Sequence, residues 1–269
     1  MEEVSKESPE VDIIVCTVNL LNYTKLAFET LYNNTKVPFH LIVVDICSQD
    51  GSQKWFKKFA KEKGNVTLVL KDKKDKGFGE GFNSGLEHCK TPYAASYHSD
   101  MLVTKTGWIK YLLAVMNKDP KIAYVGSKLL YPNGTIQHVG ATFQKSTFQW
   151  YHFGAGKDKS KFSGTFETPG VTGAGSLIRR SAIPKGLPTF YERAEYSDVE
   201  VSCQLRKAGW KIFSCGKSVL YHAESLGKKK YWNWNELQKR YGRHIKTFQS
   251  KWGKWLEKDM KKNPHLYNY

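Results

Sequence analysis

Three aspartates of this sequence, Asp45, Asp100 and Asp198, lie where a predicted strand or helix meets a turn. A buried carboxylate that lacks a partner costs several kcal/mol, so each of them needs a cation, a hydroxyl or a backbone N–H beside it. The chemistry open to such groups is the binding of a divalent metal, recognition of a ribose or base, and proton abstraction by a general base.

The stretch "ASYHSDMLV" runs from small and apolar residues into His98, Ser99 and Asp100 and then back to apolar ones. A strand-end aspartate beside a serine and a histidine can hold Mg²⁺ or Mn²⁺, with phosphate oxygens as the other ligands. The alternative is a turn or a helix cap before Thr104. The residues alone leave both interpretations open.

Asp45 stands near the end of the apolar run "HLIVVDI", where a predicted strand gives way to a turn. In nucleotide-binding α/β folds a carboxylate in this place commonly meets a ribose hydroxyl or a base edge. Its alternative role is to cap the next helix, for which Ser48 and Asp50 are better placed.

The segment "KGFGEGFNSG", Lys76 to Gly85, has glycines at 77, 79, 81 and 85. Glycines at the start of a helix let backbone N–H groups approach an anion. Lys76 and Asn83 add possible donors. The spacing is neither a Walker A loop nor a dinucleotide fingerprint, so the pattern alone is a weak signal.

Asp198 begins the helix predicted for Asp198–Ala208, where it could cap the helix or act as a general base. His222 ends the following strand, in "VLYH". A single histidine in such a place is more often hydrogen-bonded structure than a ligand, and the same holds for His138 and His152.

Alternating strands and helices position these side chains. The first half contains apolar strands that alternate with amphipathic helices, which indicates a doubly wound α/β sheet of mostly parallel strands. The predicted strands are Val11–Val18, His40–Ile46, Asn65–Asp72 and a fourth that begins at Tyr93 and ends at Asp100. Because ligands collect at the carboxyl ends of such strands, the placement of Asn19, Asp45 and Asp100 there favours function over capping.

The second half has a different pattern. A hairpin is predicted around Asn133-Gly134, and the loop-rich segment 146–170 is the predicted mobile lid. From Asn235 to Lys258 apolar residues recur every three or four positions, which predicts a helix of about 36 Å whose other face is basic.

The composition bounds the class of protein. The chain has 269 residues, a net charge of +17 and five scattered cysteines without a C-x-x-C pair. Neither a disulfide framework nor a zinc site is expected. The N-terminus lacks the apolar stretch of a secretory signal and no apolar run could span a membrane, so we expect a cytoplasmic protein. The positive charge attracts anions of any kind, including nucleotide sugars, lipids and nucleic acid.

Seven segments of the chain occur in a familiar order: "IIVCTVN", "VVDICSQDGS", "KGFGEGFNSG", "YHSDMLVTKTGWI", "YPNGTIQHVG", "GAGSLIRR" and "SDVEVSCQLRKAGW". Together they resemble the nucleotide-diphospho-sugar transferases of glycosyltransferase family 2, and most closely its rhamnosyltransferase-like branch. The resemblance implies a GT-A fold, a mostly parallel Rossmann-like sheet flanked by helices, over residues 11–224. A flexible tail, 1–10, would precede it. The basic Trp-rich extension, 225–269, would pack on the same domain.

The resemblance also implies roles for individual residues. Asp198 would be the catalytic base, and Asp100 with His222 would hold Mn²⁺ or Mg²⁺. The donor would be bound by Thr17, Asn19, Asp45, Lys76, Gly77, Asn83, Ser99 and Asp100. The acceptor would be bound by Gly173, Ala174 and Gly175. Ser99 and Ser197 stand where the family more often has an acid or an asparagine.

The implied reaction is an inverting transfer of a hexosyl or deoxyhexosyl unit from a UDP-, dTDP- or GDP-sugar to a hydroxyl of a glycan, a lipid-linked or a protein-linked acceptor. Two alternatives remain. The acceptor could be nucleic acid, such as a modified DNA base, with lysines on phosphates and tryptophans stacked on bases. The chain could instead be a catalytically inactive module that binds nucleotide sugar or, through its basic helix, the inner surface of the membrane.

Overall fold

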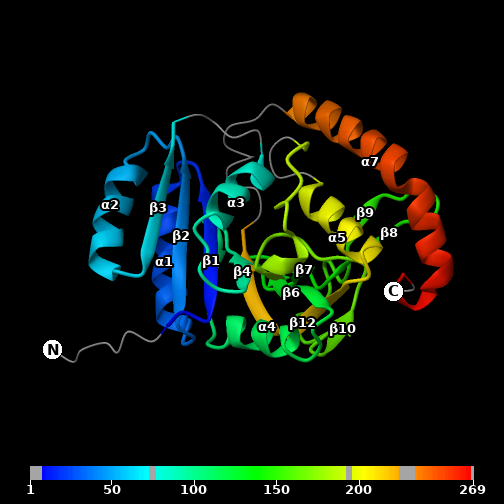
Figure 1. The fold of residues 1–269 in the computed structure, drawn as a ribbon, viewed down its shortest axis with the longest axis horizontal. Coiled ribbons are helices and arrows are strands. Elements are labelled where there is room, and N and C mark those ends of the chain that lie inside the picture. The colour runs from blue at the N-terminus through cyan, green and yellow to red at the C-terminus, as the bar shows by residue number, and fades with distance from the viewer. Residues whose placement is uncertain (1–7, 73–76, 192–195, 224–233, 268–269) are drawn as a thin grey trace.

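A ten-stranded sheet flanked by helices forms the centre of the protein in a computed structural model, which describes residues 8–72, 77–191, 196–223 and 234–267 (Figure 1). The strand order is β10-β12-β6-β11-β4-β1-β2-β3, with β5 paired to β12 and β7 to β6. The strands are β1 (Val11–Thr17), β2 (Phe39–Ile46), β3 (Val66–Lys71), β4 (Tyr93–Ser96), β5 (Met101–Leu102), β6 (Ile122–Leu130), β7 (Ile136–His138), β10 (Thr165–Glu167), β11 (Ser176–Arg179) and β12 (Lys211–His222). A separate two-stranded sheet joins β8 (Ala141–Phe143) to β9 (Trp150–His152).

Helices cover both faces of the sheet because its central strands are apolar on both faces. In β1, Ile13 and Val15 pack with α1, α2 and α4, whereas Ile14 packs with α3 and α5. The helices are α1 (Leu21–Asn34), α2 (Ser52–Lys63), α3 (Phe78–Leu86), α4 (Trp108–Met116), α5 (Ser197–Lys207) and α7 (Trp234–Lys262). Strands β1, β2, β3 and β4 run parallel, and β6 runs parallel to β12, as the doubly wound prediction requires.

The register of the strands brings polar residues to the carboxyl ends of the strands. Thr17 at the end of β1 lies opposite Asp45 of β2. At the other side of the sheet, β5 pairs antiparallel with the end of β12, so that His222 lies opposite Met101. This second pairing places Asp100 beside the end of β12.

The region after β6 forms the predicted hairpin and then a longer excursion. Strands β6 and β7 are antiparallel around the Asn133-Gly134 turn, where the Gly134 N–H donates to the carbonyl of Tyr131 at 2.8 Å. Segment 146–170, predicted as a lid, contains β9 and β10, and three of its own side chains, Phe153, Phe162 and Phe166, pack against a small apolar cluster. Its role as a lid stays a prediction.

Helix α7 is longer than the predicted Asn235–Lys258 and lies along α5 and the β8–β9 sheet (Figure 1). Its apolar side buries Phe248, Trp252 and Leu256. Arg206 of α5 pairs with Asp259 of α7 at 2.8 Å. No helix in the described part of the chain is both long enough and apolar enough to cross a bilayer.

Two predicted boundaries need correction. Strand β4 ends at Ser96, and Asp100 lies in the turn between β4 and β5. Helix α5 begins at Ser197 after Tyr196, which has the left-handed φ of 58°, so Asp198 lies within the first turn and does not cap the helix.

Candidate active site

Two histidines and one aspartate meet beside the ends of β4 and β12. Ligand atoms of His98, Asp100 and His222 all lie within 4.8 Å of one another, and Asp100 Oδ1 is 3.3 Å from His222 Nε2. Two ligands about 2.1 Å from one ion lie about 3 Å apart when adjacent and about 4.2 Å apart when opposite. The donor set therefore fits one divalent cation.

The electrostatics of this cluster favour the ionised carboxylate. Burial raises the pKa of Asp100, but the hydrogen bond with His222 and the positive charges available on His222 and His98 outweigh it, so the pKa lies below its ordinary value. Asp100 and His222 have side chains only 12 % and 11 % exposed. Because the carboxylate of Asp100 is largely shielded from water, its negative charge attracts a cation strongly.

Asp198 is held by donors from a neighbouring loop. Its Oδ2 accepts from the Thr172 hydroxyl at 2.9 Å and from the Gly173 N–H at 3.1 Å, while Oδ1 accepts from the Val199 N–H at 2.9 Å. The side chain is partly exposed. A carboxylate fixed in orientation and reachable from solvent can accept a proton from a bound hydroxyl.

Phe78, the first residue of α3, links Asp198 to the group of His98, Asp100 and His222, which we call the metal-type cluster. Its ring lies 5.6 Å from the ring of His98, centroid to centroid. The same ring lies against Gly173, where an added Cβ would come within 3.2 Å of it. The two predicted functional aspartates, Asp100 and Asp198, thus belong to one region of the structure.

The predicted nucleoside end lies on β1 and β2. Asp45 is fully buried, and its Oδ1 accepts from the Ser48 N–H at 3.1 Å and from the Gln53 amide at 2.8 Å. Its other oxygen, Oδ2, is buried without a hydrogen-bond partner. Asn19 turns its side-chain oxygen to the Gln49 N–H at 2.9 Å and so ties two loops together. Thr17 is buried opposite Asp45, and Ser99, which precedes Asp100 in the chain, is buried as well.

The glycines of the glycine-rich segment have two different roles: one precedes helix α3, and others allow close packing. Lys76 lies outside the described residues, and Gly77 precedes α3 in an extended conformation. An added Cβ at Gly79 would meet the Pro188 carbonyl at 2.2 Å, and one at Gly85 would meet Ile14 at 2.6 Å. These two glycines therefore serve close packing rather than an anion.

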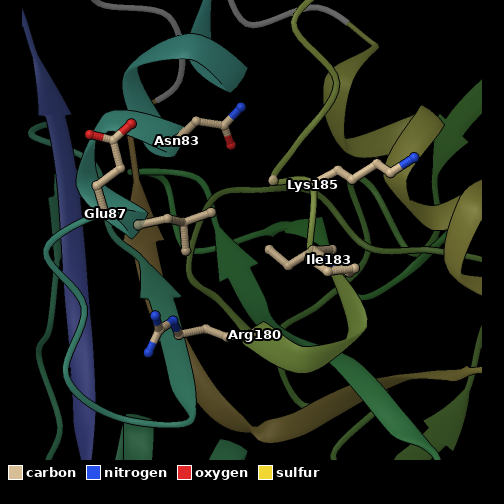
Figure 2. A pocket seen from close by; sticks show the side chains of 8 residues that line it. Asn83, Glu87, Arg180, Ile183 and Lys185 are labelled. Carbon is tan, nitrogen blue, oxygen red and sulfur yellow. The ribbon is translucent and has the colours of Figure 1, made fainter.

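Asn83 is separated from the other predicted donor ligands. Its amide donates to the Leu187 carbonyl at 2.9 Å and accepts from the Leu187 N–H at 2.7 Å. Asn83 lines a cavity of about 410 Å³. The charged side chains around this cavity are mixed in sign and include Glu87, Arg180 and Lys185 (Figure 2). Neither observation connects Asn83 with the metal-type cluster.

The three predicted acceptor residues differ in their surroundings. Gly173 supports Asp198, as described above. The side chain of Ala174 is buried in the core, and Gly175, with a left-handed φ of 62°, packs against Leu220 and Met101. Only Gly173 therefore lies beside a group that could do chemistry.

A family model for "Glycosyl transferase family 2" matches residues 12–187. The chain belongs to glycosyltransferase family 2. Among curated relatives, "Uncharacterized protein y4gI" of Sinorhizobium fredii is 25 % identical over 96 % of this chain, and the O-antigen biosynthesis protein RfbC of Myxococcus xanthus is 30 % identical over 49 % of it. The chain spans 29 % and 11 % of the lengths of these two proteins.

Solved structures show the same GT-A fold. The mannosyltransferase PcManGT from Pyrobaculum calidifontis, in complex with GDP-Man and Mn²⁺, matches 81 % of this chain and 58 % of its own, with a TM-score of 0.60 and 18 % identity. GalNAc-T7 with UDP, GalNAc and Mn²⁺ matches 80 % of this chain and 44 % of its own, with a TM-score of 0.67 and 13 % identity. The predicted fold class is therefore confirmed.

Sequence reasoning missed three groups of this family 2 glycosyltransferase. His98 was not among the predicted ligands, although its spacing of two residues from Asp100 was a usable signal. Gln137 lies against His222, with its Oε1 2.8 Å from Nδ1. The buried His138 accepts from the Thr172 N–H at 3.3 Å, and burial lowers its pKa well below the ordinary value, helped by His152 and His222.

Proposed function

We propose that this protein is a metal-dependent inverting glycosyltransferase that moves a sugar from a nucleotide-diphospho-sugar to an acceptor hydroxyl. One observation carries the proposal. A cluster suited to a divalent cation, built on Asp100 and His222, lies in the same region as the oriented carboxylate of Asp198, with Phe78 against both. Family membership supports the reaction class.

The metal end would be held by Asp100 and His222, with His98 as a third ligand. A divalent cation there offsets negative charge on the diphosphate leaving group. Two imidazoles beside one carboxylate favour Mn²⁺ over Mg²⁺, because Mg²⁺ takes oxygen ligands by preference. Mn²⁺ is also present in the structures of PcManGT and GalNAc-T7.

Asp198 would act as the general base. It takes the proton of the acceptor hydroxyl, whose oxygen forms a bond with the anomeric carbon. The bond from that carbon to the diphosphate oxygen breaks, and the nucleoside diphosphate leaves with the electron pair. A single in-line displacement of this kind inverts the configuration of the anomeric carbon.

The nucleoside would lie over the ends of β1 and β2. Asp45 Oδ2, buried without a partner, is a ready acceptor for a base N–H or a ribose hydroxyl, and Thr17 lies opposite it. We propose a UDP-, dTDP- or GDP-sugar that carries a hexosyl or deoxyhexosyl unit. The similarity to an O-antigen biosynthesis protein supports the rhamnosyltransferase-like branch and a glycan, lipid-linked or protein-linked acceptor.

The exposed face of α7 is the proposed contact with an anionic surface. Its exposed cations include Lys239, Arg243, Lys246 and Lys254, all on the side opposite the buried Phe248. We propose peripheral contact with the inner face of a membrane. We expect the protein to bind vesicles that contain phosphatidylglycerol and not to bind neutral vesicles. The affinity for the anionic vesicles should fall as the salt concentration rises. Stronger binding to DNA would favour the nucleic-acid acceptor.

The test is a panel of nucleotide sugars with Mn²⁺, scored for release of nucleoside diphosphate, with the anomeric configuration of the product read by NMR. We expect one donor to stabilise the protein in a thermal-shift screen and to turn over. A retained configuration would contradict the inverting mechanism. Failure of every donor to bind in the presence of Mn²⁺ would contradict the proposal as a whole.

A further inference from the structure

We infer that the short strand β7 (Ile136–His138) aligns both halves of the active site. Gln137 fixes the imidazole of His222, and the adjacent His138 fixes the Thr172 peptide that supports the catalytic base. Both are positioning residues. The inference rests on the proposed function, because it assigns roles toward the metal and the base.

Strand β7 is a rigid base for such a task. It pairs antiparallel with β6, and its three residues are all buried, with His138 fully inaccessible. Successive side chains of a strand point to opposite faces. Gln137 and His138 therefore reach different neighbours, although they are adjacent in sequence.

Gln137 contacts His222 at two points. Its Oε1 lies 2.8 Å from Nδ1 of the imidazole, and its Nε2 donates to the His222 backbone carbonyl at 3.5 Å. An amide oxygen accepts only, so Nδ1 is the donor in this contact. The other nitrogen, Nε2, faces Asp100 Oδ1 at 3.3 Å.

The contact with Gln137 thus occupies Nδ1 and turns Nε2 toward Asp100, so that the two groups that would hold the cation face each other. A hydrogen-bond acceptor behind a ligating imidazole also orients the ring and raises its basicity.

His138 performs the matching task for the base. Its Nε2 accepts from the Thr172 N–H at 3.3 Å, so Nε2 carries no proton. Its Nδ1 lies 2.7 Å from Nδ1 of His152 and, in the neutral ring, donates to it. His138 thereby fixes the N–H of Thr172, while the Thr172 hydroxyl and the Gly173 N–H donate to Asp198.

The two residues should fail in different ways when they are changed. Loss of the Gln137 acceptor frees the His222 ring to rotate or to change tautomer, which weakens the metal site. Loss of the His138 acceptor lets the Thr172 peptide move and misplaces Asp198, which slows proton transfer with the metal still bound. A purely structural role would lower stability alone and would not separate these effects.

The first experiment measures Mn²⁺ affinity by paramagnetic resonance of the free ion, both with Mn²⁺ alone and with excess UDP or GDP. Gln137→Met removes the acceptor at nearly constant volume and is expected to weaken Mn²⁺ binding about 10- to 100-fold. Gln137→Glu keeps an acceptor facing Nδ1 and is expected to retain affinity. Gln249→Met, on α7, is the control for the chemical change and should bind as the parent does.

The second experiment compares His138→Gln with His138→Asn. The glutamine oxygen can take the place of Nε2 and accept from Thr172, whereas the asparagine side chain ends near the position of Nδ1. We expect His138→Asn to lower kcat about 10- to 100-fold with Mn²⁺ affinity and donor KM unchanged. His138→Gln should recover most of kcat at similar thermal stability.

The outcomes separate this inference from the proposed function. A parent protein that binds Mn²⁺ in neither arm overturns both. A parent that binds Mn²⁺ and turns over, beside a Gln137→Met variant with equal affinity, overturns the role of Gln137 alone. Equal kcat values for the two His138 variants, or a parallel loss of Mn²⁺ affinity in both, overturn the role of His138.

Discussion

Asp100 Oδ1 lies 3.3 Å from Nε2 of His222, although 122 positions separate the two residues, because β5 pairs antiparallel with the last residues of β12. The Ala223 N–H also donates to the Asp100 carbonyl at 3.0 Å, which fixes the turn from both sides. The metal-type site is therefore a product of this long-range pairing.

Substitution of Asp100 or His222 should abolish most metal-dependent turnover. We expect Asp100→Asn and His222→Ala each to lower kcat/KM by about 10²-fold or more, since charge stabilisation at the leaving group is worth several kcal/mol. Kinetics across a Mn²⁺ series measure the effect. Asp119→Asn, at a partly exposed acid paired with Lys211, is the matched control. Equal loss in the control would contradict the site.

Asp198→Asn should separate chemistry from donor binding. The amide keeps the shape of the side chain but cannot take a proton, so kcat is expected to fall about 10²- to 10⁴-fold. The thermal shift produced by the donor with Mn²⁺ should remain, because Asp198 lies with Thr172 and Gly173 on the proposed acceptor side. Turnover within threefold of the parent would remove Asp198 from the mechanism.

Asp45→Asn tests the nucleoside end. The unpartnered Oδ2 can accept from a donor molecule, and a hydrogen bond to a charged group is worth about 1.5–3 kcal/mol. We therefore expect donor Kd to rise about 10- to 100-fold with kcat nearly unchanged. Calorimetry with the nucleoside diphosphate alone measures this directly. Unchanged affinity would show that the nucleoside lies elsewhere.

The sequence predicts the parts of this structure that depend on local pattern. Apolar runs predict β1, β2 and β3, and their ends predict the edge where Thr17 and Asp45 meet. Asp100 and Asp198 were named from their positions in the chain and from a resemblance. Both lie in one region of the structure.

The failures concern long-range contacts. His98 becomes a candidate ligand only because β12 returns beside β5, and no local pattern encodes that return. The glycine-rich pattern alone is a weak signal for anion binding, and close packing against Pro188 and Ile14 explains two of its glycines, Gly79 and Gly85. The sequence alone does not distinguish a glycine needed for close packing from one that lets the backbone approach an anion.

Asp12 should make stability depend on pH. Burial raises its pKa, but hydrogen bonds from His40 and from Thr91 outweigh burial, so its pKa lies below the ordinary value. The Oδ1–Nδ1 distance to His40 is 2.7 Å, and both side chains are buried. A carboxylate whose pKa is lower in the folded state stabilises above its unfolded pKa of about 3.9, and this contribution disappears as pH falls through the folded pKa.

Asp12→Asn should therefore lower the free energy of unfolding by about 3 kcal/mol near pH 7, because the buried Asp12 carboxylate accepts several hydrogen bonds and each bond to a charged group contributes about 1.5–3 kcal/mol. Urea denaturation of both proteins from pH 7 to pH 3 should show the two curves converge at acid pH. A constant difference across this range would mean that packing, not charge, accounts for the loss.

Helix α7 should be part of the cooperative fold. Phe248 is fully buried and stacks on Phe143 with ring centroids 5.7 Å apart. Phe248→Ala is expected to lower the free energy of unfolding by about 3–5 kcal/mol, whereas Lys246→Ala, on the exposed face of the same helix, should change it by less than about 0.5 kcal/mol. Tryptophan fluorescence and circular dichroism, followed together in urea, should give one coincident transition for each variant. An early loss of helicity in Phe248→Ala with the main transition unmoved would instead make α7 an appended element that the catalytic domain does not need for its stability.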